Sequence, residues 1–336
     1  MRIALIYDEP TPESTWVEAE YESPQTIEAL LDALRRNGHR AVGVPFDGGL
    51  TDVLRRKRPD LAFNIAEGRS GPSRETIVPA VLELLDIPYT GSDGVTLGVS
   101  LNKAMTKRLA AGAGVPTPEF RLFRSAEEAR AEADDLPYPM LVKPNFGGSS
   151  VGVGPESIAS EASELAPLVE RCTERYEQPC LVEEFIDGED VTVGLLGNGP
   201  VEALPVGKVV AGGGMYGELA KSMHNRQVIC PCDLPDGLDE KLIEWSLETY
   251  RVIGARDLAR VDYMLDGHGN AWMLEINPLP GLSPYYGVLP VLAEAAGYDH
   301  TQLIGRILEA AIERSSQKET TTGGLATRAA RQRADR

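Results

Sequence analysis

Two carboxylates and a carboxamide lie within apolar sequence near the C-terminal end of the chain. Asp262 interrupts the alternating segment 259–265, and Glu275 and Asn277 lie in the apolar segment 271–277, with turn residues between the two segments. The pattern predicts a hairpin in which Glu275 and Asn277 share one face of their strand and Asp262 comes to the same face. Hard oxygen ligands, few enough to leave room for water and phosphate, suit Mg²⁺ rather than Zn²⁺. We therefore predict a magnesium site on this hairpin.

A solvated hairpin face with ordinary acids is the alternative explanation. It suits Asp266, which lies in the turn, better than Glu275, which is flanked by apolar residues and followed directly by a proline-rich run. Arg260 lies two residues before Asp262, so both side chains are expected on one face of their strand. The sequence thus places a cation beside the expected metal ligands.

A lysine followed by glycines is the second feature that could do chemistry. Lys143 lies near the end of the apolar segment 138–144, and the run 145–154 contains four glycines together with Ser149 and Ser150. Glycines let backbone N–H groups close around a phosphate, and hydroxyls add further donors. The order differs from the G-x-x-x-x-G-K-[ST] motif, because the lysine precedes the glycines. A tight turn and a lysine at a strand end would explain each part separately; together they predict a flexible lid over phosphate.

Three other stretches could contact a ligand. The strand sequence 180–186 ends in two glutamates and two apolar residues, a mixture that suits adenine but that is also found at ordinary strand ends. The glycine-rich segment 66–74 follows an apolar strand, a position where α/β sheets bind ligands, although a tight connection would look similar. The segment 208–228 reads as a long loop, and long loops in compact domains are usually functional.

Composition limits the class of protein. The chain has 336 residues, 42% of them hydrophobic, and a net charge of −18, which predicts a globular protein of two or three domains and argues against a nucleic-acid binder. Its 4 cysteines match no zinc spacing and are expected to be free thiols in a reducing cytosol. No signal peptide or membrane-spanning run is visible, so we expect a cytoplasmic protein with no membrane partner.

The expected elements begin with a parallel sheet. Strands at 1–7, 41–45 and 61–65, separated by helical sequence, give the β-α-β-α-β order of a doubly wound parallel sheet within residues 1–100. Beyond residue 101 the elements read as smaller α+β units. The polar and basic segment 315–336 is predicted to be a disordered tail.

The ordered set of motifs resembles the ATP-grasp superfamily, and more closely the D-alanine–D-alanine ligase family and its relatives. Single pieces are common, whereas the ordered set is specific and spans nearly the whole chain. The resemblance is carried by Ile87-Pro-Tyr-Thr-Gly-Ser92, Leu101-Asn-Lys103, Leu141-Val-Lys-Pro144, Gly147-Gly-Ser-Ser-Val-Gly152, Leu181-Val-Glu-Glu184, Ala259-Arg-Val-Asp262, Leu274-Glu-Ile-Asn277 and Pro280-Gly-Leu-Ser283.

This resemblance implies an ATP-grasp fold of three domains, with ATP between the second and the third. Residues 1–100 would form a Rossmann-like N-terminal domain, residues 101–186 the central domain with the lid, and residues 187–314 the C-terminal domain with the magnesium site. Lys103 and Lys143 would reach the phosphates, Glu183 the adenine amino group and Asp190 the ribose. The residues implied to contact ATP are Lys103, Lys143, Gly148, Ser149, Ser150, Val151, Glu183, Glu184, Phe185, Ile186, Asp190, Lys221 and Asn277.

The reaction implied is ATP-dependent joining of a carboxylate to an amine through an acyl phosphate, which forms ADP. Asp262, Glu275 and Asn277 would hold two Mg²⁺ ions, for which Mn²⁺ is an expected substitute. Arg260 would stabilise the oxyanion of the reacting carboxylate, and Lys221 would reach the γ-phosphate from a mobile loop. The implied catalytic residues are Arg260, Lys221, Ser150 and Glu20.

The substrate-binding motifs depart from the family pattern. The glycine-rich N-terminal signature G-G-x-S-x-E-x-x-V-S is absent, and Glu20 is the nearest stand-in for the glutamate that holds the first amine. Glu67 replaces the histidine of a His-Gly pair, and Tyr286 replaces part of a Ser-x-Ser region. These changes predict that D-alanine is a poor acceptor and that a larger or more cationic amine is preferred. The implied substrate contacts are Glu67, Arg260, Gly281, Ser283 and Tyr286.

Three functions remain open at this point. One is a ligase for substrates other than two D-alanines, in natural-product or peptide assembly, and another is a true D-alanine–D-alanine ligase of cell-wall synthesis. The third is a non-catalytic ATP-binding relative. The intact set of Arg260, Asp262, Glu275 and Asn277 favours catalysis, because a pure binder would not need all four. The expected partners are small amino-acid, carboxylate and amine substrates, with a homodimer as an open question.

Overall fold

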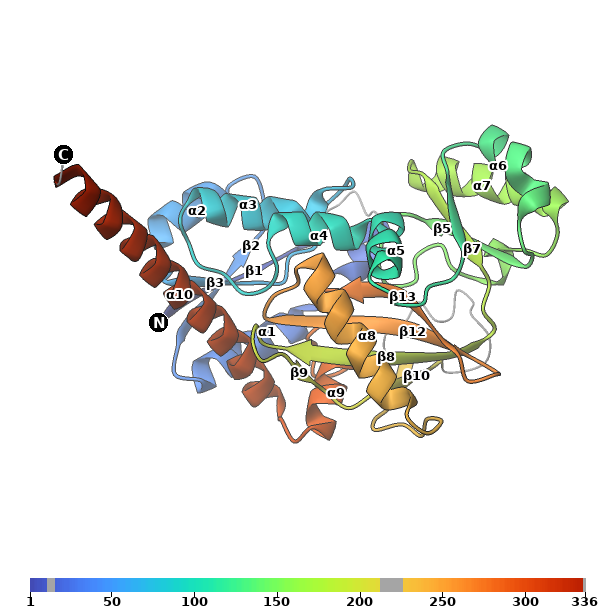
Figure 1. Cartoon of the computed structure of the whole chain (residues 1–336). Coiled ribbons are helices and arrows are strands. Elements are labelled where there is room, and N and C mark those ends of the chain that lie inside the picture. Colours follow the sequence, from blue (N-terminus) through green and yellow to red (C-terminus); the bar gives the residue numbers. More distant parts are fainter. Residues whose placement is uncertain (11–15, 212–225, 335–336) are drawn as a thin grey trace.

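Three separate sheets are found in the part of the chain that the structure describes, and each takes its strands from its own stretch of sequence (Figure 1). The structure is a computed structural model that describes residues 1–10, 16–211 and 226–334. Within these ranges no helix is long and apolar enough to cross a membrane. Domain boundaries at residues 100, 186 and 314 stay a prediction, since the sheets alone do not mark where one unit ends.

The N-terminal sheet is parallel, as the sequence predicts, with strand order β2-β1-β3. Side chains alternate across β1: Ile3 and Leu5 pack into one core with helices α1 and α10, while Ala4 and Ile6 pack into another with α2 and α3. The sheet is therefore covered on both faces. Its elements are β1 (Arg2–Tyr7), α1 (Pro24–Arg36), β2 (Arg40–Pro45), α2 (Leu50–Lys57), β3 (Leu61–Asn64) and α3 (Ile77–Leu84).

Two helices connect this unit to a small antiparallel sheet with strand order β4-β7-β5-β6. Met140, Val142 and Val182 face a core that is closed by α6 and α7. Pairing of β5 with β7 brings Lys143 and Glu183 close together at the inner end of the sheet. The elements are α4 (Gly94–Leu101), α5 (Lys103–Gly112), β4 (Phe120–Phe123), α6 (Ala126–Glu132), β5 (Met140–Pro144), β6 (Ile158–Ala159), α7 (Ala162–Tyr176) and β7 (Cys180–Glu184).

The largest sheet has the order β11-β10-β8-β12-β13, with β9 paired to β8. The predicted hairpin is confirmed as β12 and β13, an antiparallel pair. Helix α8 packs over this sheet with Leu238, Leu242 and Tyr250 in the core. The elements are β8 (Gly188–Leu196), β9 (Glu202–Ala203), β10 (Gly207–Ala211), β11 (Arg226–Ile229), α8 (Leu238–Ile253), β12 (Leu258–Asp266), β13 (Ala271–Asn277), α9 (Val288–Ala295) and α10 (His300–Ala334).

Two predictions about irregular segments need correction. The ends of the predicted loop 208–228 are the paired strands β10 and β11, because β-branched residues there extend the sheet edge; residues 212–225 lie outside the described part of the chain. The predicted disordered tail from residue 315 instead continues helix α10 to Ala334, and it projects away from the rest of the molecule (Figure 1). Extending a helix that is already formed avoids the cost of nucleation, and alanine, arginine and glutamine are good helix formers.

Candidate active site

The predicted metal ligands lie together on one face of the β12–β13 hairpin. Asp262 is directly opposite Glu275, and Arg260 is directly opposite Asn277, so cross-strand pairing places all four side chains on the same face. Asn277 Nδ2 donates to Asp262 Oδ2 at 2.8 Å. The register shifts between Asp262 and Tyr263, a bulge that the sequence pattern does not reveal. Bulges of this kind re-aim side chains and are common next to active sites.

Each carboxylate of this face is paired with a cation. Arg260 donates to both oxygens of Asp262, at 2.8 and 2.9 Å. Lys103 Nζ lies 2.7 Å from Glu275 Oε2. Burial raises the pKa of Glu275, but Lys103, Lys143 and Arg260 together outweigh burial and lower that pKa to about 2. Two carboxyl groups and an amide oxygen on one face fit Mg²⁺, which takes oxygen ligands.

Thr192 on the neighbouring strand β8 supports this arrangement. It pairs with Asp262 across the sheet, and its hydroxyl donates to Asp262 Oδ1 at 2.6 Å. Hydrogen bonds of this kind orient carboxylates that bind metals. Thr192 is 1% exposed, so this buried contact fixes Asp262 from the side of the sheet.

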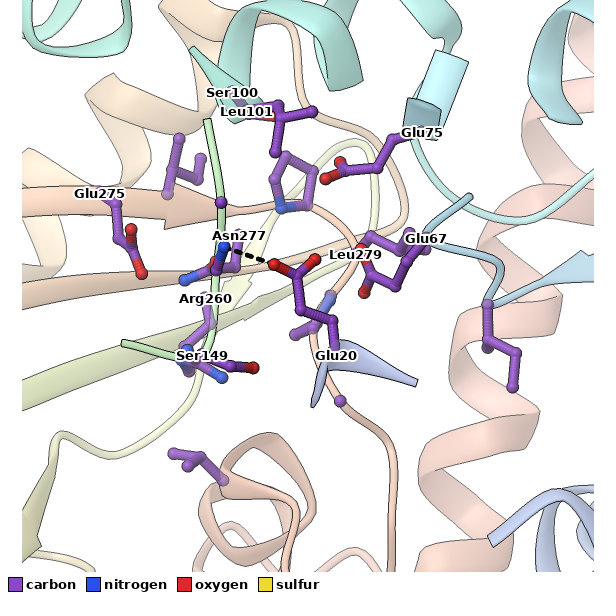
Figure 2. Close-up of a pocket in the computed structure, with 18 of the residues that line it drawn as sticks. Glu20, Glu67, Glu75, Ser100, Leu101, Ser149, Arg260, Glu275, Asn277 and Leu279 are labelled. Atoms are coloured by element: carbon purple, nitrogen blue, oxygen red, sulfur yellow. Dashed lines mark hydrogen bonds between the residues drawn. The ribbon is translucent and has the colours of Figure 1, made fainter. Parts of the chain in front are cut away.

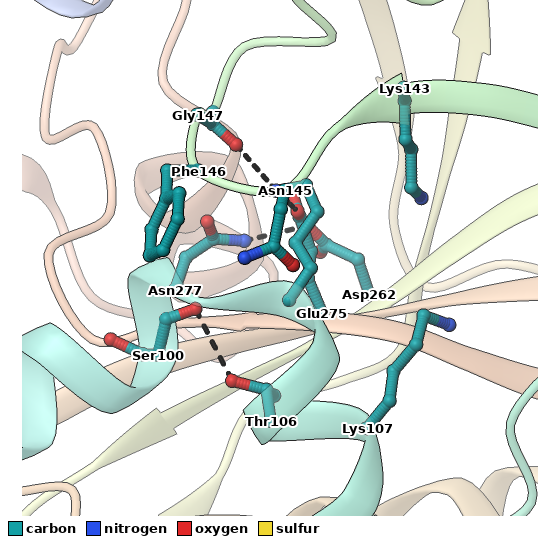
Figure 3. A network of polar contacts seen from close by, with 12 residues as sticks. Ser100, Thr106, Lys107, Lys143, Asn145, Phe146, Gly147, Asp262, Glu275 and Asn277 are labelled. Atoms are coloured by element: carbon teal, nitrogen blue, oxygen red, sulfur yellow. Dashed lines mark hydrogen bonds and ion pairs between the residues drawn. The ribbon is translucent and has the colours of Figure 1, made fainter. Parts of the chain in front are cut away.

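The predicted lid, residues 147–152, lies at the mouth of this face and is anchored at its base. Gly147 and Lys103 are in contact, because the Gly147 carbonyl accepts from Lys103 Nζ (Figure 3). Ser149 and Ser150 have φ angles of 50° and 57°, a left-handed conformation that is costly for residues other than glycine. Gly152 has φ 75°, and a Cβ there would lie 2.8 Å from Pro144, so only glycine fits. Val151 follows the two serines in the same turn.

Glu183 lies between two lysines rather than open to solvent. Its side chain is bonded to Lys143 and lies 2.8 Å from Lys107 Nζ. Burial raises the pKa of Glu183, but the two ammonium groups outweigh it and lower the pKa to about 2. Burial also lowers the pKa of Lys107 to about 8, against the effect of Glu183. A buried, ionised carboxylate of this kind is a fixed acceptor for an N–H donor such as an amino group.

The backbone next to Glu183 is partly occupied. The Glu184 N–H donates to Glu119 at 2.9 Å, and the Phe185 N–H donates to Pro139 at 2.9 Å. Ile186 follows at the end of the strand, and Asp190 lies in β8 next to β12. The predicted loop lysine, Lys221, lies outside the described residues. Its role over the γ-phosphate therefore stays a prediction.

A cavity of about 120 Å³ separates the hairpin and the lid from the N-terminal unit (Figure 2). Glutamates line the N-terminal side, and the carboxylate oxygens of Glu20, Glu67 and Glu75 all lie within 4.8 Å of one another. Arg74, 1% exposed, lies 2.5 Å from Glu20 and 3.5 Å from Glu75. Burial, followed by the charges of Glu75 and Glu20, raises the pKa of Glu67 well above its usual range. Burial and mutual repulsion therefore make Glu67 and Glu75 on this acidic wall harder to ionise than a free glutamate.

Glu20 and Glu67, the two predicted contacts of the amine, differ in whether other side chains or the lid already bond to them. Glu20 accepts from the lid, at 2.7 Å from Gly148 N, and its other oxygen pairs with Arg74. The Glu67 side chain makes no hydrogen bond or ion pair within the described part of the chain, although it lines the cavity. Glu67 is thus the better placed of the two to receive an amine from a ligand.

The loop after β13 carries the other predicted substrate contacts. Gly281 and Tyr286 line the cavity, whereas Ser283 is 0% exposed and accepts from Thr26 at 2.9 Å. Ser283 therefore lies behind the cavity wall, and its contact with a substrate stays a prediction. The tyrosine hydroxyl donates to Glu22 at 2.9 Å.

Several residues of the site are not evident from the sequence. Lys107, Arg74, Glu75 and Glu22 are charged residues that reach the site only through tertiary packing. The signal that could have found Lys107 is its spacing, four residues after Lys103 on one helix and thus on the same face. Arg74 lies in the glycine-rich segment predicted to contact a ligand, but its partners could not be assigned.

Comparison with known proteins identifies the family. The sequence model described as D-ala D-ala ligase C-terminus matches residues 109–309. The D-alanine–D-alanine ligase of Pelotomaculum thermopropionicum is 32% identical over 300 residues, which cover 87% of this chain and 92% of that protein. An uncharacterized protein, y4sG, of Sinorhizobium fredii is 34% identical over 318 residues, 91% of each chain.

A solved structure agrees with the sequence relatives. The D-alanine–D-alanine ligase from Bacillus anthracis complexed with ATP has a TM-score of 0.77 and 24% identity, and the match covers 95% of this chain and 99% of that one. At that identity the likeness establishes the fold. Together with the sequence matches, it shows that the chain belongs to the D-alanine–D-alanine ligase family, ATP-dependent and ADP-forming ligases of the ATP-grasp fold that make a carbon–nitrogen bond.

Proposed function

We propose that this protein joins a carboxylate to an amine other than D-alanine, through an acyl phosphate. The observation that carries the proposal is the single hairpin face on which Asp262, Glu275 and Asn277 converge, with Arg260 and Lys103 bonded to it. A carboxylate is a poor electrophile, and transfer of the γ-phosphoryl group to it supplies a leaving group. The metal ligands and cations of the hairpin suit such a transfer, because positive charge held in a fixed position stabilises the phosphoryl group as it is transferred.

The reaction would proceed by phosphoryl transfer followed by attack of the amine. A carboxylate oxygen of the first substrate attacks the γ-phosphorus of ATP, the bond from that phosphorus to the β-phosphate oxygen breaks, and ADP leaves. The amine nitrogen then attacks the acyl carbon and gives a tetrahedral oxyanion. The carbon–oxygen bond to phosphate breaks, inorganic phosphate leaves, and the nitrogen loses a proton as the amide forms.

In this scheme Asp262, Glu275 and Asn277 hold Mg²⁺, two ions in our proposal, with Mn²⁺ able to replace them. Bound Mg²⁺ would neutralise the phosphate oxygens. Arg260 and Lys103 are paired with Asp262 and Glu275 in this structure. If those carboxylates bound metal instead, Arg260 would be free to stabilise the oxyanion and Lys103 to bind phosphate. Backbone N–H groups and serines of residues 147–152 close over the phosphates and exclude water, and Ser150 and Lys221 act there.

The nucleotide base would lie at the ends of β7 and β5. Glu183, fixed by Lys107 and Lys143, supplies an ionised acceptor for the adenine amino group. Lys143 can turn from Glu183 towards phosphate or a ring nitrogen. Residues 184–186 flank the base, and Asp190 on β8 receives the ribose.

The acidic wall of the cavity favours a cationic amine. Glu67 has no hydrogen-bond or ion-pair partner among the described residues, and Glu20 and Glu75 lie beside it, so an ammonium group placed there would favour the ionised form of Glu67 and gain charge-assisted hydrogen bonds. The carboxylate of D-alanine as acceptor would lie against the same carboxyl groups, make their ionisation still less favourable and gain no ion pair from them. We therefore expect slow D-alanyl-D-alanine formation.

A hydroxylamine screen tests the proposal. Wild-type protein, ATP and Mg²⁺ are mixed with single amino acids and small carboxylic acids, hydroxylamine replaces the amine, and ADP and hydroxamate are measured. ADP and hydroxamate in equal amounts with one class of acid support the acyl phosphate, and ATP turnover that leaves no hydroxamate contradicts it. D-alanine alone, with mass spectrometry of the product, tests the substrate argument: rapid dipeptide formation would overturn it and leave the mechanism standing.

A further inference from the structure

The side chain of Glu22 accepts hydrogen bonds from donors that could equally bind the carboxylate of a ligand. It lines the cavity just beyond the short 3-10 helix Trp16–Glu20. Glu22 Oε1 accepts from Leu282 N at 2.9 Å, and Oε2 accepts from the Tyr286 hydroxyl at 2.9 Å. The Ser283 N–H and the Thr26 hydroxyl, which donates to Ser283 Oγ, lie near enough to favour the ionised form of this carboxyl group. One backbone N–H group and one hydroxyl bonded to the same carboxylate, with further donors close by, form a binding site suited to an anion.

These donors border the cavity, where a ligand could reach them, but the carboxylate of Glu22 already occupies them. Gly281 and Tyr286, which flank the donors, face the same cavity as Arg260 and Asn277. A Cβ at Gly281 would lie 3.3 Å from Glu22 Oε1, so the carboxylate is closely packed against the loop. None of the ion pairs in the described part of the chain involves Glu22. Its charge is balanced by hydrogen bonds alone, and a second anion placed beside it would be repelled.

The cations of the cavity do not change this balance. Lys103 and Arg260 line the cavity, but they are paired with Glu275 and Asp262 on the hairpin face. Glu67 adds a further carboxyl group, and so a further acceptor, on the N-terminal side. A substrate group that lies against residues 281–286 therefore finds acceptors rather than free donors.

We propose that Glu22 determines specificity by taking the place of a substrate carboxylate, so that the amine substrate carries a neutral or cationic group, and no free carboxylate, next to residues 281–286. The proposal rests on the ligase function proposed above and narrows its amine substrate. An amide, an amine or an already joined peptide group can donate to Glu22, whereas a free amino acid cannot place its carboxylate there.

Lysine and lysinamide are the matched probes, since they differ only in the charge of one group. With an acid found active in the hydroxylamine screen as donor, we expect wild-type protein to use lysinamide at least about tenfold better than lysine in kcat/KM, measured for both enantiomers by mass spectrometry of the product. That ratio is the loss expected from one repelled or unpaired carboxylate.

Two variants of Glu22 test the cause. Glu22→Ala frees Leu282 N and the Tyr286 hydroxyl, so lysine should improve and the preference for lysinamide should fall about tenfold or reverse. Glu22→Gln keeps the shape, removes the charge and should give an intermediate ratio even if the alanine variant folds poorly. Glu28→Ala, an exposed position on α1, is the control and should keep the wild-type ratio.

Failure of this inference can be told apart from failure of the ligase proposal. Hydroxamate formation with equal use of lysine and lysinamide by wild type and Glu22→Ala would overturn the role of Glu22 and leave the ligase chemistry intact. If no acid gives hydroxamate, binding decides: thermal shifts with the non-hydrolysable analogue AMP-PNP and Mg²⁺ should be larger for lysinamide than for lysine in wild type, and the order should reverse in Glu22→Ala. The same order in both proteins, or no shift with either probe, would also overturn it.

Discussion

Replacing Glu75 by glutamine should make the protein markedly more stable at alkaline pH. Glu75 is 7% exposed, and its carboxylate lies among those of Glu20 and Glu67, with Arg74 as a neighbouring cation at 3.5 Å. Burial, helped by the charges of Glu20 and Glu275, raises the pKa of Glu75 to about 8 against the opposing effect of Arg74 and Lys103. Glutamine keeps the shape of the side chain and removes the ionisation.

The sign and size follow from proton linkage. A carboxyl group whose pKa is higher in the folded than in the unfolded chain stabilises the fold below the unfolded pKa, and this stability is lost as pH rises through the folded pKa. For Glu75 that window runs from 4.5 to about 8. At about 1.4 kcal/mol per pH unit, the ionised group costs up to about 5 kcal/mol of unfolding free energy above the window.

Urea unfolding of the nucleotide-free protein at about pH 5 and about pH 9 measures this effect. Wild type should lose stability between the two conditions, and Glu75→Gln should lose several kcal/mol less, with the two proteins nearly equal at the lower pH. Glu240→Gln, an exposed position on α8, is the control and should follow wild type. If Glu75→Gln changes the free energy of unfolding by the same amount at both pH values, ionisation of Glu75 does not destabilise the fold and the reasoning is refuted.

Three further predictions concern the nucleotide and metal sites. Asp262→Asn and Glu275→Gln should keep the thermal melt of wild type but lower ADP formation by roughly 10²–10³-fold, as EDTA should in wild type; full activity in either variant would exclude the metal role. Limited proteolysis should cut residues 147–152 in the free protein and much less with ATP and Mg²⁺, and equal cutting would make that loop a structural turn. Lys107→Met should cost about 3–5 kcal/mol of stability and weaken ATP binding, because it leaves buried Glu183 with one cation; an unchanged urea midpoint would contradict this.

Periodicity was sufficient for the elements that alternate strongly. The β12–β13 hairpin could be predicted because strand alternation, a five-residue turn and misplaced acids occur together, and cross-strand pairing then leaves one way to bring Asp262 and Glu275 to the same face. The bulge after Asp262 could not be predicted, since it depends on how β12 meets two neighbouring strands. The strands β10 and β11 were missed for a related reason: glycines between them suggested a loop, while their pairing is decided by the open edge of β8.

The acidic wall shows where reading a sequence reaches its limit. Glu20, Glu67 and Glu75 are spread over the first part of the chain, and only the packing of residues 16–22 against the loop after β3 brings their carboxylates together. Arg74 has no distinguishing pattern in the sequence, yet it is buried beneath the wall and lies over the Trp16 ring at 5.7 Å. Resemblance to a family therefore predicts residues for ATP and metal, because those depend on local motifs, and it could not predict this wall.

We expect substrate selection to depend on residues that tertiary packing brings together and that belong to no local motif. The hairpin presents the same charge pattern to any acyl phosphate, so changing the amine requires no change to Asp262 or Arg260. A second surface of the cavity lies between residues 16–22 and 281–286, where Glu22 accepts from Leu282 N and from the Tyr286 hydroxyl. In the proposal above, Glu22 would act on the amine substrate without disturbing the hairpin, because these two hydrogen bonds involve no hairpin group. This separation would let one ATP-grasp site keep its chemistry while the amine that it accepts is set from the N-terminal side.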